Sequence, residues 1–139
     1  MFEMLRASAA DQGCAASLAI TEADLRVDGF GLRPRFRCVI AEQEQAPAGM
    51  ALYFFNYSTW VSRIGLYIED LYVAPKFRRM GVARALLDHL AAIAKKEGCR
   101  RMQWLVHREN AAALRLYQSF GAKALDDWML MTLKEDAAS

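Results

Sequence analysis

The clearest pattern of hydrophobic and polar positions lies just past the middle of the chain. Val82, Leu86 and Leu90 recur at helical spacing, and a lysine pair and a glycine close the segment. This period predicts an amphipathic helix over residues 82–94 that buries one face. A second helix is predicted after Asn110, and its apolar side chains share one face: Leu114, Tyr117 and Phe120.

Elsewhere the hydrophobic period shortens to two, and β-branched and aromatic side chains become frequent, which is typical of strands. The segments with this pattern are residues 37–42, 48–55, 64–73, 101–106, 122–125 and 129–133. Strands therefore stand on both sides of the two helices along the chain. The sequence predicts an α/β (α+β) architecture in which helices pack on a mixed sheet.

The first thirty residues have a helical character. Ser8 and Thr21 each stand where an N-cap signal precedes apolar residues at helical spacing. Residues 28–31, with two glycines, are predicted to form a turn. The tail from Lys134 to Ser139 is expected to be frayed.

Length and composition fit a single domain over residues 1–139. The chain is 55% hydrophobic and 24% charged, with a net charge of +2. This near balance excludes a strongly positive field over the whole surface, of the kind that nucleic-acid binding uses, but leaves a local basic patch open. No apolar run approaches the roughly 18 residues of a membrane span, and the N-terminus lacks a signal-peptide pattern. We therefore expect a cytoplasmic protein with neither a membrane nor a nucleic-acid partner.

The cysteines and histidines predict no metal site. Cys14, Cys38 and Cys99 are widely spaced, and their odd number without a CxxC pair argues against a disulfide framework or a zinc site. His89 and His107 lie too far apart in sequence for metal-ligand spacing. Reduced thiols in a cytoplasmic protein are the expected state.

The most informative segment runs from Glu69 to Arg84, where an apolar strand enters a basic turn and the predicted helix follows at once. A helix N-terminus offers free N–H groups and a partial positive charge, which together can hold a phosphate. Gly81 and Ala83 are small where such a group would approach, and the turn adds cationic side chains: Arg78, Arg79 and Arg84. An ordinary loop-to-helix junction with solvated arginines is equally compatible with this composition. The patterns of a Walker A loop and of a Rossmann fingerprint are both absent.

Arg78-x-x-Gly81-x-Ala83, between a strand and a helix, resembles the pyrophosphate loop of the GNAT acetyltransferase superfamily. Other segments are similar to its diamine acetyltransferase branch, and some to the bacterial thialysine N-ε-acetyltransferase-like members: residues 28–31, 51–60, 67–73, 110–122 and 126–128. The resemblance covers about residues 20–133. It implies a mixed, mainly antiparallel sheet of about six to seven strands flanked by helices, with a shortened N-terminal helical region.

The resemblance also implies how acetyl-CoA, the expected co-substrate, would be held. The backbone of Leu71, Tyr72 and Val73 would pair with the pantetheine arm, and Asn110 and Ala113 would contact the co-substrate at the start of the next helix. The pyrophosphate loop itself comprises Arg78, Arg79, Met80, Gly81, Val82, Ala83 and Arg84.

Two residues match the catalytic positions of the family. Tyr117 matches the tyrosine taken to protonate the leaving thiolate, and Glu69 matches the carboxylate taken to bind the amine or to deprotonate it through water. An alkyl ammonium has a pKa near 10 and must lose a proton before it attacks, whereas a phenol of pKa about 10 can protonate a thiolate. By periodicity alone, the commoner role for Tyr117 is that of a core aromatic beside Leu114 and Phe120. An acidic pair such as Glu69 and Asp70 is more often a solvated strand edge, although apolar residues flank this pair.

Aromatic and acidic residues along the chain are the side chains that a cationic amine requires. The predicted substrate-binding set is Trp60, Glu69, Asp70, Trp104, Leu105, Asp126 and Trp128. For the tryptophans, simple packing is the commoner role.

The chain departs from the family pattern at several places. The region between Ser8 and Thr21 is shorter than the first helical region of the family, and Arg79 stands where many members have glycine. His107 and the two residues after it replace a more usual acidic-aromatic pair. Ser58 stands where polyamine-acting members have an acidic residue, which favours a smaller amine.

The expected function is acetyl-CoA-dependent N-acetylation of a primary amine on a small cationic molecule, thialysine-like, lysine-like or a diamine. The acceptor would attack directly in a ternary complex, so no cysteine is needed as a nucleophile. Two alternatives remain: acetylation of a protein lysine or N-terminus, and a catalytically silent acyl-CoA-binding module. The resemblance also implies a homodimer, often built through the C-terminal strands.

Overall fold

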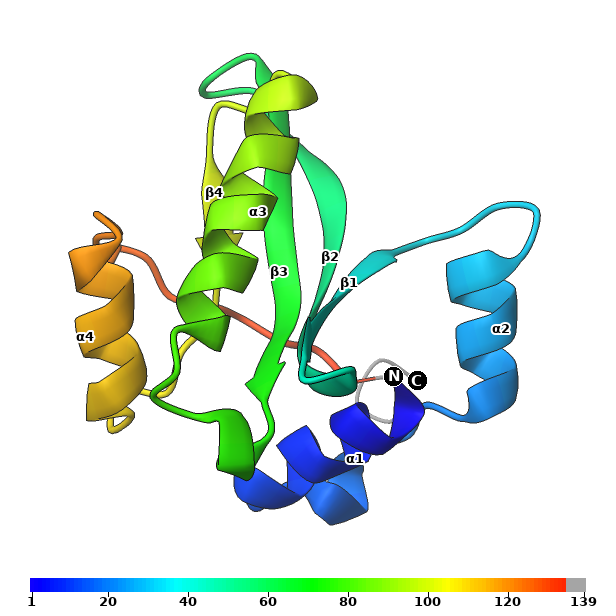
Figure 1. The fold of residues 1–139 in the computed structure, drawn as a ribbon. Coiled ribbons are helices and arrows are strands. Elements are labelled where there is room, and N and C mark those ends of the chain that lie inside the picture. The colour runs from blue at the N-terminus through cyan, green and yellow to red at the C-terminus, as the bar shows by residue number, and fades with distance from the viewer. Residues whose placement is uncertain (135–139) are drawn as a thin grey trace. The chain divides into compact units, whose positions relative to one another are not determined.

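The computed structural model describes residues 1–134 (Figure 1). The chain divides into two compact units, one from Met1 to Leu105 and the other from Val106 onward. The elements of the first unit are α1 (Phe2–Asp11), the 3-10 turn η1 (Ala15–Ser17), α2 (Glu22–Phe30), β1 (Arg37–Gln43), β2 (Ala46–Ser58), β3 (Arg63–Val73), the 3-10 turn η2 (Pro75–Phe77), α3 (Val82–Lys96) and β4 (Met102–Trp104). The second unit contains α4 (Ala111–Ser119).

The first unit is built on a four-stranded sheet in the order β1-β2-β3-β4. The pairs β1–β2 and β2–β3 are antiparallel, and β3–β4 is parallel. The mixed, mainly antiparallel sheet flanked by helices is thus confirmed. The expected six to seven strands are wrong, since the described residues form four.

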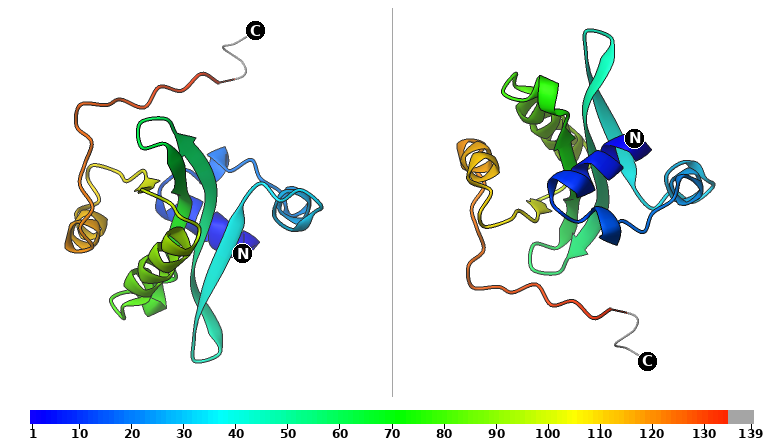
Figure 2. Two further views of the ribbon diagram at one scale, coloured as in Figure 1. Left: turned by 90° about the horizontal axis from the view of Figure 1, so that it is seen from above. Right: turned by 90° about the horizontal axis from the view of Figure 1, so that it is seen from below.

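Helices cover both faces of this sheet. A Cβ on Gly49 of β2 would meet Val82 and Leu86 of α3, whereas the next residue, Met50, is buried with Leu5 of α1 and with α2. Because successive strand residues point to opposite faces, α3 packs on one face and the N-terminal helices on the other. Figure 2 shows α3 on one side of the strands and α2 on the other.

Gly49 lets the first turn of α3 approach the sheet closely. A Cβ there would lie 2.6 Å from the backbone oxygen of Tyr72 and 3.2 Å from Val82 Cγ1. We expect Gly49→Ala to lower the free energy of unfolding by about 1–3 kcal/mol, because neither neighbour is the end of a long flexible side chain. Chemical denaturation measures this change, and an unchanged unfolding midpoint would contradict the close packing.

The N-terminal capping signals have different outcomes. Thr21 forms a capping box with Asp24, as its sequence predicts, and the two side chains are 2.6 Å apart. Ser8 is instead buried inside α1, which begins at Phe2 and ends before the left-handed Gly13. The turn predicted over residues 28–31 is wrong in its first part, because α2 continues to Phe30 and leaves only Gly31 as its cap. Apolar residues before Ser8 extend the helix toward the N-terminus, so the serine faces the core.

The C-terminal strands predicted over residues 122–125 and 129–133 are also wrong, since the structure contains no strand between residues 120 and 134. An apolar run has strand propensity, but a strand forms only where a neighbouring edge supplies hydrogen bonds. The large apolar side chains of this segment are exposed: Leu125, Trp128, Met129, Leu130, Met131 and Leu133. The fraying expected after Lys134 concerns residues outside the described part of the chain.

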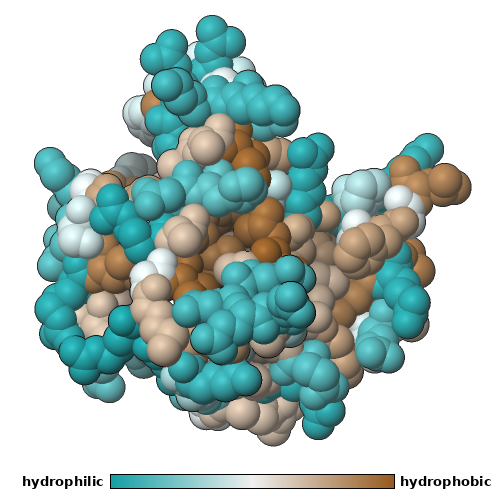
Figure 3. Space-filling view, viewed as in Figure 1, coloured by the Kyte–Doolittle hydropathy of each residue, from teal (hydrophilic) through white to brown (hydrophobic). Residues whose placement is uncertain are grey.

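Two further observations concern the helices and the exposed apolar side chains. Within residues 1–134, no helix combines the length and the hydrophobicity that crossing a membrane requires. Figure 3 shows hydrophobic side chains at the surface near α2, where Val27, Phe30 and Leu32 are exposed.

Candidate functional site

The C-terminal half of β3 has one open edge. β4 pairs only with Leu66, Tyr67 and Ile68, and beyond them β3 continues to Val73 without a partner on that side among the described residues. Glu69 is the residue left over where the β2–β3 register shifts, between the pairs Tyr53–Ile68 and Leu52–Asp70. Such a bulge bends a strand and re-aims its side chains, and bulges are common next to active sites.

The bulge also decides which backbone groups reach the open edge. Before it, Leu66 N donates to Arg101 O at 3.0 Å, so Leu66 faces β4. After it, Ala74 N donates to Ala48 O at 2.8 Å on the β2 side. Since backbone groups alternate along a strand, Leu71 and Val73 face away from β2. The open edge thus offers their amide groups to an extended ligand.

The loop after β3 ends at an uncapped helix. Arg79 and Gly81 both have left-handed backbones, with φ of 62° and 80°. No side chain caps the N-terminus of α3, and a Cβ on Gly81 would meet nothing within 4 Å. The N-cap Gly81 thus offers no side-chain acceptor to the first N–H groups of α3, and this end of the helix stands beside open space. This is the arrangement that binds phosphate groups in many proteins.

The loop arginines have different surroundings. Arg84 Nε lies 3.3 Å from the Asp88 carboxylate one turn along α3. Arg78 Nε donates to Val73 O at 3.0 Å, and Arg78 Nη2 pairs with Asp11 Oδ2 at the end of α1. Asp11 is a site residue that the sequence did not reveal, because nothing in the local pattern links residue 11 to residue 78.

Two carboxylates lie at the bulge. Glu69 is exposed, whereas Asp70 is half-buried, and burial together with the nearby Glu69 charge raises the pKa of Asp70 above its usual value. Tyr67, two residues before Glu69, also has a raised pKa, first because of burial and then because of the Glu69 carboxylate. A cationic group would relieve the repulsion between the two acids.

The second unit carries the other predicted catalytic group. Asn110 caps α4, and its side chain accepts a hydrogen bond from Ala113 N at 3.1 Å. Tyr117 is partly buried on the same helix, and burial raises the pKa of its phenol. The phenol therefore holds its proton throughout the neutral range. Asp126 and Trp128 follow in the extended segment, where both are exposed.

The remaining predicted substrate residues lie in the first unit. Trp60 is 85% exposed in the turn between β2 and β3, Trp104 is the last residue of β4, and Leu105 follows it. Trp60 lies at the end of β3 opposite to Glu69, so the structure does not bring these two together through β3.

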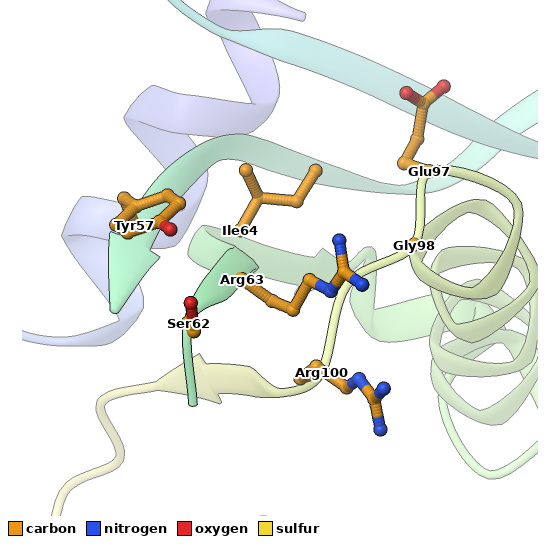
Figure 4. A pocket seen from close by; sticks show the side chains of 7 residues that line it. All are labelled: Tyr57, Ser62, Arg63, Ile64, Glu97, Gly98 and Arg100. Carbon is orange, nitrogen blue, oxygen red and sulfur yellow. The ribbon is translucent and has the colours of Figure 1, made fainter. Parts of the chain in front are cut away.

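A pocket of about 540 Å³ lies at that opposite end, where β3 begins and α3 finishes. Figure 4 shows its lining, with the Arg63 side chain extending toward Gly98. The pocket contains none of the predicted site residues: it is lined by Tyr57, Ser62, Arg63, Ile64, Glu97, Gly98 and Arg100. We place the candidate site at the open edge of β3 instead, because the N-terminus of α3 that has no side-chain cap follows it. Over residues 1–134, no group of three potential metal ligands occurs.

Comparison with known proteins identifies this arrangement. The sequence model of the acetyltransferase (GNAT) family matches residues 3–122. Thialysine N-epsilon-acetyltransferase of Sus scrofa is 35% identical over 135 residues, which cover 91% of this chain and 79% of the relative. Spermidine/spermine N(1)-acetyltransferase-like protein 1 of Homo sapiens is 33% identical over 146 residues, which cover 98% of this chain and 21% of that protein.

A solved structure shares the fold. An integron cassette protein from the mobile metagenome of V. cholerae superimposes with a TM-score of 0.79 at 22% identity, covering 98% of this chain and 85% of that one. With the family match, the open strand edge and the uncapped helix acquire a common explanation. The chain belongs to the GNAT family of acetyltransferases, in the branch of the thialysine and diamine enzymes, and is an N-acetyltransferase.

Proposed function

We propose that this protein transfers an acetyl group from acetyl-CoA to a primary amine of a small cationic molecule, thialysine-like, lysine-like or a diamine. The observation that carries the proposal is the open edge of β3, which leads from the acidic bulge at Glu69 to the uncapped N-terminus of α3. The acidic bulge suits an ammonium group, and the N-terminus of α3 suits a diphosphate. The names of the relatives, which include thialysine and spermidine/spermine acetyltransferases, support the same class of acceptor.

Acetyl-CoA supplies the acetyl group as an activated thioester. The backbone of Leu71, Tyr72 and Val73 would lie along its pantetheine arm, and the loop from Arg79 to Arg84 would surround the pyrophosphate. Open space at Gly81 and the absence of a side-chain cap on α3 fit this assignment, because both favour the close approach of a phosphate. Asn110 and Ala113 would provide further contacts from α4.

The proton transfers are assigned to two side chains. Glu69 would hold the acceptor ammonium and pass its proton to water, so that the neutral amine attacks directly. Tyr117 would donate its proton to the departing thiolate, and its raised pKa keeps that proton in place at neutral pH. Asp70 would add a second negative charge beside Glu69 and strengthen the preference for a cation.

We expect Glu69→Gln to raise the KM for the amine roughly tenfold and to leave CoA affinity unchanged. The change removes a charge-assisted hydrogen bond worth about 1.5–3 kcal/mol, and about 1.4 kcal/mol corresponds to a factor of ten. Steady-state kinetics measures the KM, and calorimetry measures CoA binding. Glu42→Gln, an exposed acid on β1, is the control that should retain the wild-type KM. An unchanged KM in Glu69→Gln would mean that the amine does not bind at Glu69.

The experiment that tests the whole proposal is a thiol-release assay over a panel of amines. The panel contains thialysine, lysine, ornithine, putrescine and spermidine, together with a lysine peptide and an amine-free control. Release with one or more small amines supports the proposal. Release with the peptide alone makes the protein a protein acetyltransferase, and tight CoA binding without any release makes it a silent acyl-CoA-binding module.

We also propose a single acetyltransferase domain over residues 1–139 that works as a homodimer in the cytoplasm. Six large apolar side chains exposed between residues 125 and 133 support a dimer, since exposed apolar runs of this kind mark interaction sites. Cys14, Cys38 and Cys99 are all unpaired, which fits a reducing compartment.

A further inference from the structure

The guanidinium group of Arg78 makes three contacts, two with the end of β3 and one with the end of α1. Its Nε donates to the carbonyl of Val73 at 3.0 Å, and its Nη2 pairs with the Asp11 carboxylate. Its central carbon lies 6.0 Å from the ring centroid of Tyr72. Tyr72 is itself buried against Leu5 of α1. Arg78 therefore joins the end of α1, the end of β3 and the loop that follows β3.

That loop needs an external anchor. Arg79, the next residue, has a left-handed backbone with φ of 62°, and it is not a glycine. Such a conformation costs on the order of 1–3 kcal/mol and persists only where neighbouring contacts enforce it. Arg78 comes immediately before the strained residue, and its ties at residues 11 and 73 fix one end of the strained turn. Gly81, at the other end of the turn, has no side chain that could anchor it.

The same contacts make Arg78 a poor direct ligand of the pyrophosphate. Two of its three guanidinium nitrogens already serve Asp11 and Val73. Turning the side chain toward a phosphate would break both contacts and release the strained turn. The N-terminus of α3, which has no side-chain cap and stands beside the open space at Gly81, is the alternative ligand.

We propose that Arg78 is a positioning residue: by holding Asp11 of α1 and the Val73 carbonyl together, it shapes the loop that receives the diphosphate. The proposal rests on the proposed CoA-binding function of this loop. It makes the affinity for CoA depend on Asp11, which lies on another element and is 67 residues away in sequence. The N-terminal helix is thereby coupled to the co-substrate site.

The direction in which Asp11→Asn changes the Kd for CoA separates a positioning role of Arg78 from direct binding. If Asp11 holds Arg78 in its working position, Asp11→Asn raises the Kd for CoA about fivefold. If Arg78 must leave Asp11 to reach the diphosphate, the same change removes a competitor, and the Kd stays equal or falls. Arg78→Lys supplies the second arm: it keeps the positive charge but lacks the fork that serves two acceptors at once. Positioning predicts the same fivefold loss for Arg78→Lys, and no further loss in the double variant.

Glu3→Gln is the matched control. Glu3 is also an acid on α1, and it pairs with Arg6 on the same helix, so CoA binding should not change. Asp11→Glu should restore most of the wild-type affinity, because it returns the carboxylate. Thermal unfolding of every variant checks that it is folded.

Two readouts accompany calorimetry with CoA. Amide hydrogen exchange of residues 74–81 in the free protein should be about fivefold faster in Asp11→Asn than in the wild type. In the assay, the KM for acetyl-CoA should rise with kcat at saturation unchanged. Unchanged exchange or an unchanged Kd in Asp11→Asn overturns the proposal. Failure of the wild-type protein to bind CoA would instead refute the proposed function. The exchange measurement would still test whether the contact between Arg78 and Asp11 orders the loop.

Discussion

Replacing Tyr117 with phenylalanine is expected to lower kcat roughly 100-fold and to leave the Kd for CoA unchanged. General acid catalysis by a positioned side chain typically contributes a factor of about 10²–10⁴. Phenylalanine keeps the aromatic ring on α4 and removes only the hydroxyl, and thermal unfolding of the variant measures any effect on stability. Single-turnover kinetics at saturating amine and acetyl-CoA measures the effect.

The direction of the pKa shift keeps Tyr117 in its proton-carrying form. Burial raises the pKa of Tyr117 above the ordinary phenol value of about 10, because the charged phenolate is poorly solvated there. The folded protein therefore keeps the phenol protonated at every pH at which the assay runs. The thiolate of a thiol with a pKa of about 8.5 is less basic than the phenolate, so proton transfer from Tyr117 runs uphill by the difference between the two pKa values. Reprotonation of the phenolate from solvent completes the step.

A matched variant separates chemistry from packing. Tyr57→Phe removes a hydroxyl from an exposed tyrosine on β2 and should retain wild-type kcat. If Tyr117→Phe turns over as fast as Tyr57→Phe, Tyr117 is only a packing residue of α4, as its spacing with Leu114 and Phe120 also allows. A solvent isotope effect that disappears in Tyr117→Phe would add independent support for proton transfer from this residue.

The sequence predicts those parts of the fold whose causes are local. The period of Val82, Leu86 and Leu90 becomes the buried face of α3, and Thr21 and Asn110 form the caps that their positions suggest. The strands β1, β2 and β3 lie where the alternation placed them, with differences of one to three residues at their ends. In each case, the residues that determine the element lie close to one another in sequence.

Features that depend on distant partners were not predictable. The apolar run at residues 129–133 has strand propensity, yet it pairs with none of the strands in the described residues. The bulge at Glu69 arises from a mismatch between β2 and β3, and it alone turns Leu71 and Val73 toward the open edge. The pairing of Arg78 with Asp11 depends on how α1 lies against the end of β3. Only the three-dimensional arrangement shows these relations.

The second large effect is expected at Gly81. Gly81→Val should raise the Kd for CoA by about 10- to 100-fold. The open space around Gly81 is the space that a diphosphate would occupy at the end of α3, and a β-branched side chain would fill it. Losing one charge-assisted hydrogen bond from a backbone N–H costs about 1.5–3 kcal/mol, and each 1.4 kcal/mol is a factor of ten.

Backbone strain would complicate this result, because Gly81 has a φ of 80° and any other residue is strained there. Gly98 provides the control at the other end of α3. Its φ is 75°, and a Cβ there also meets nothing within 4 Å, so Gly98→Val introduces comparable strain far from the loop. We expect both variants to lose similar thermal stability, whereas only Gly81→Val should lose CoA affinity. Equal CoA affinities in the two variants would mean that the N-terminus of α3 does not hold the diphosphate. Because every role assigned to Glu69 and Tyr117 presumes a thioester delivered along β3, that outcome would remove the basis for both assignments.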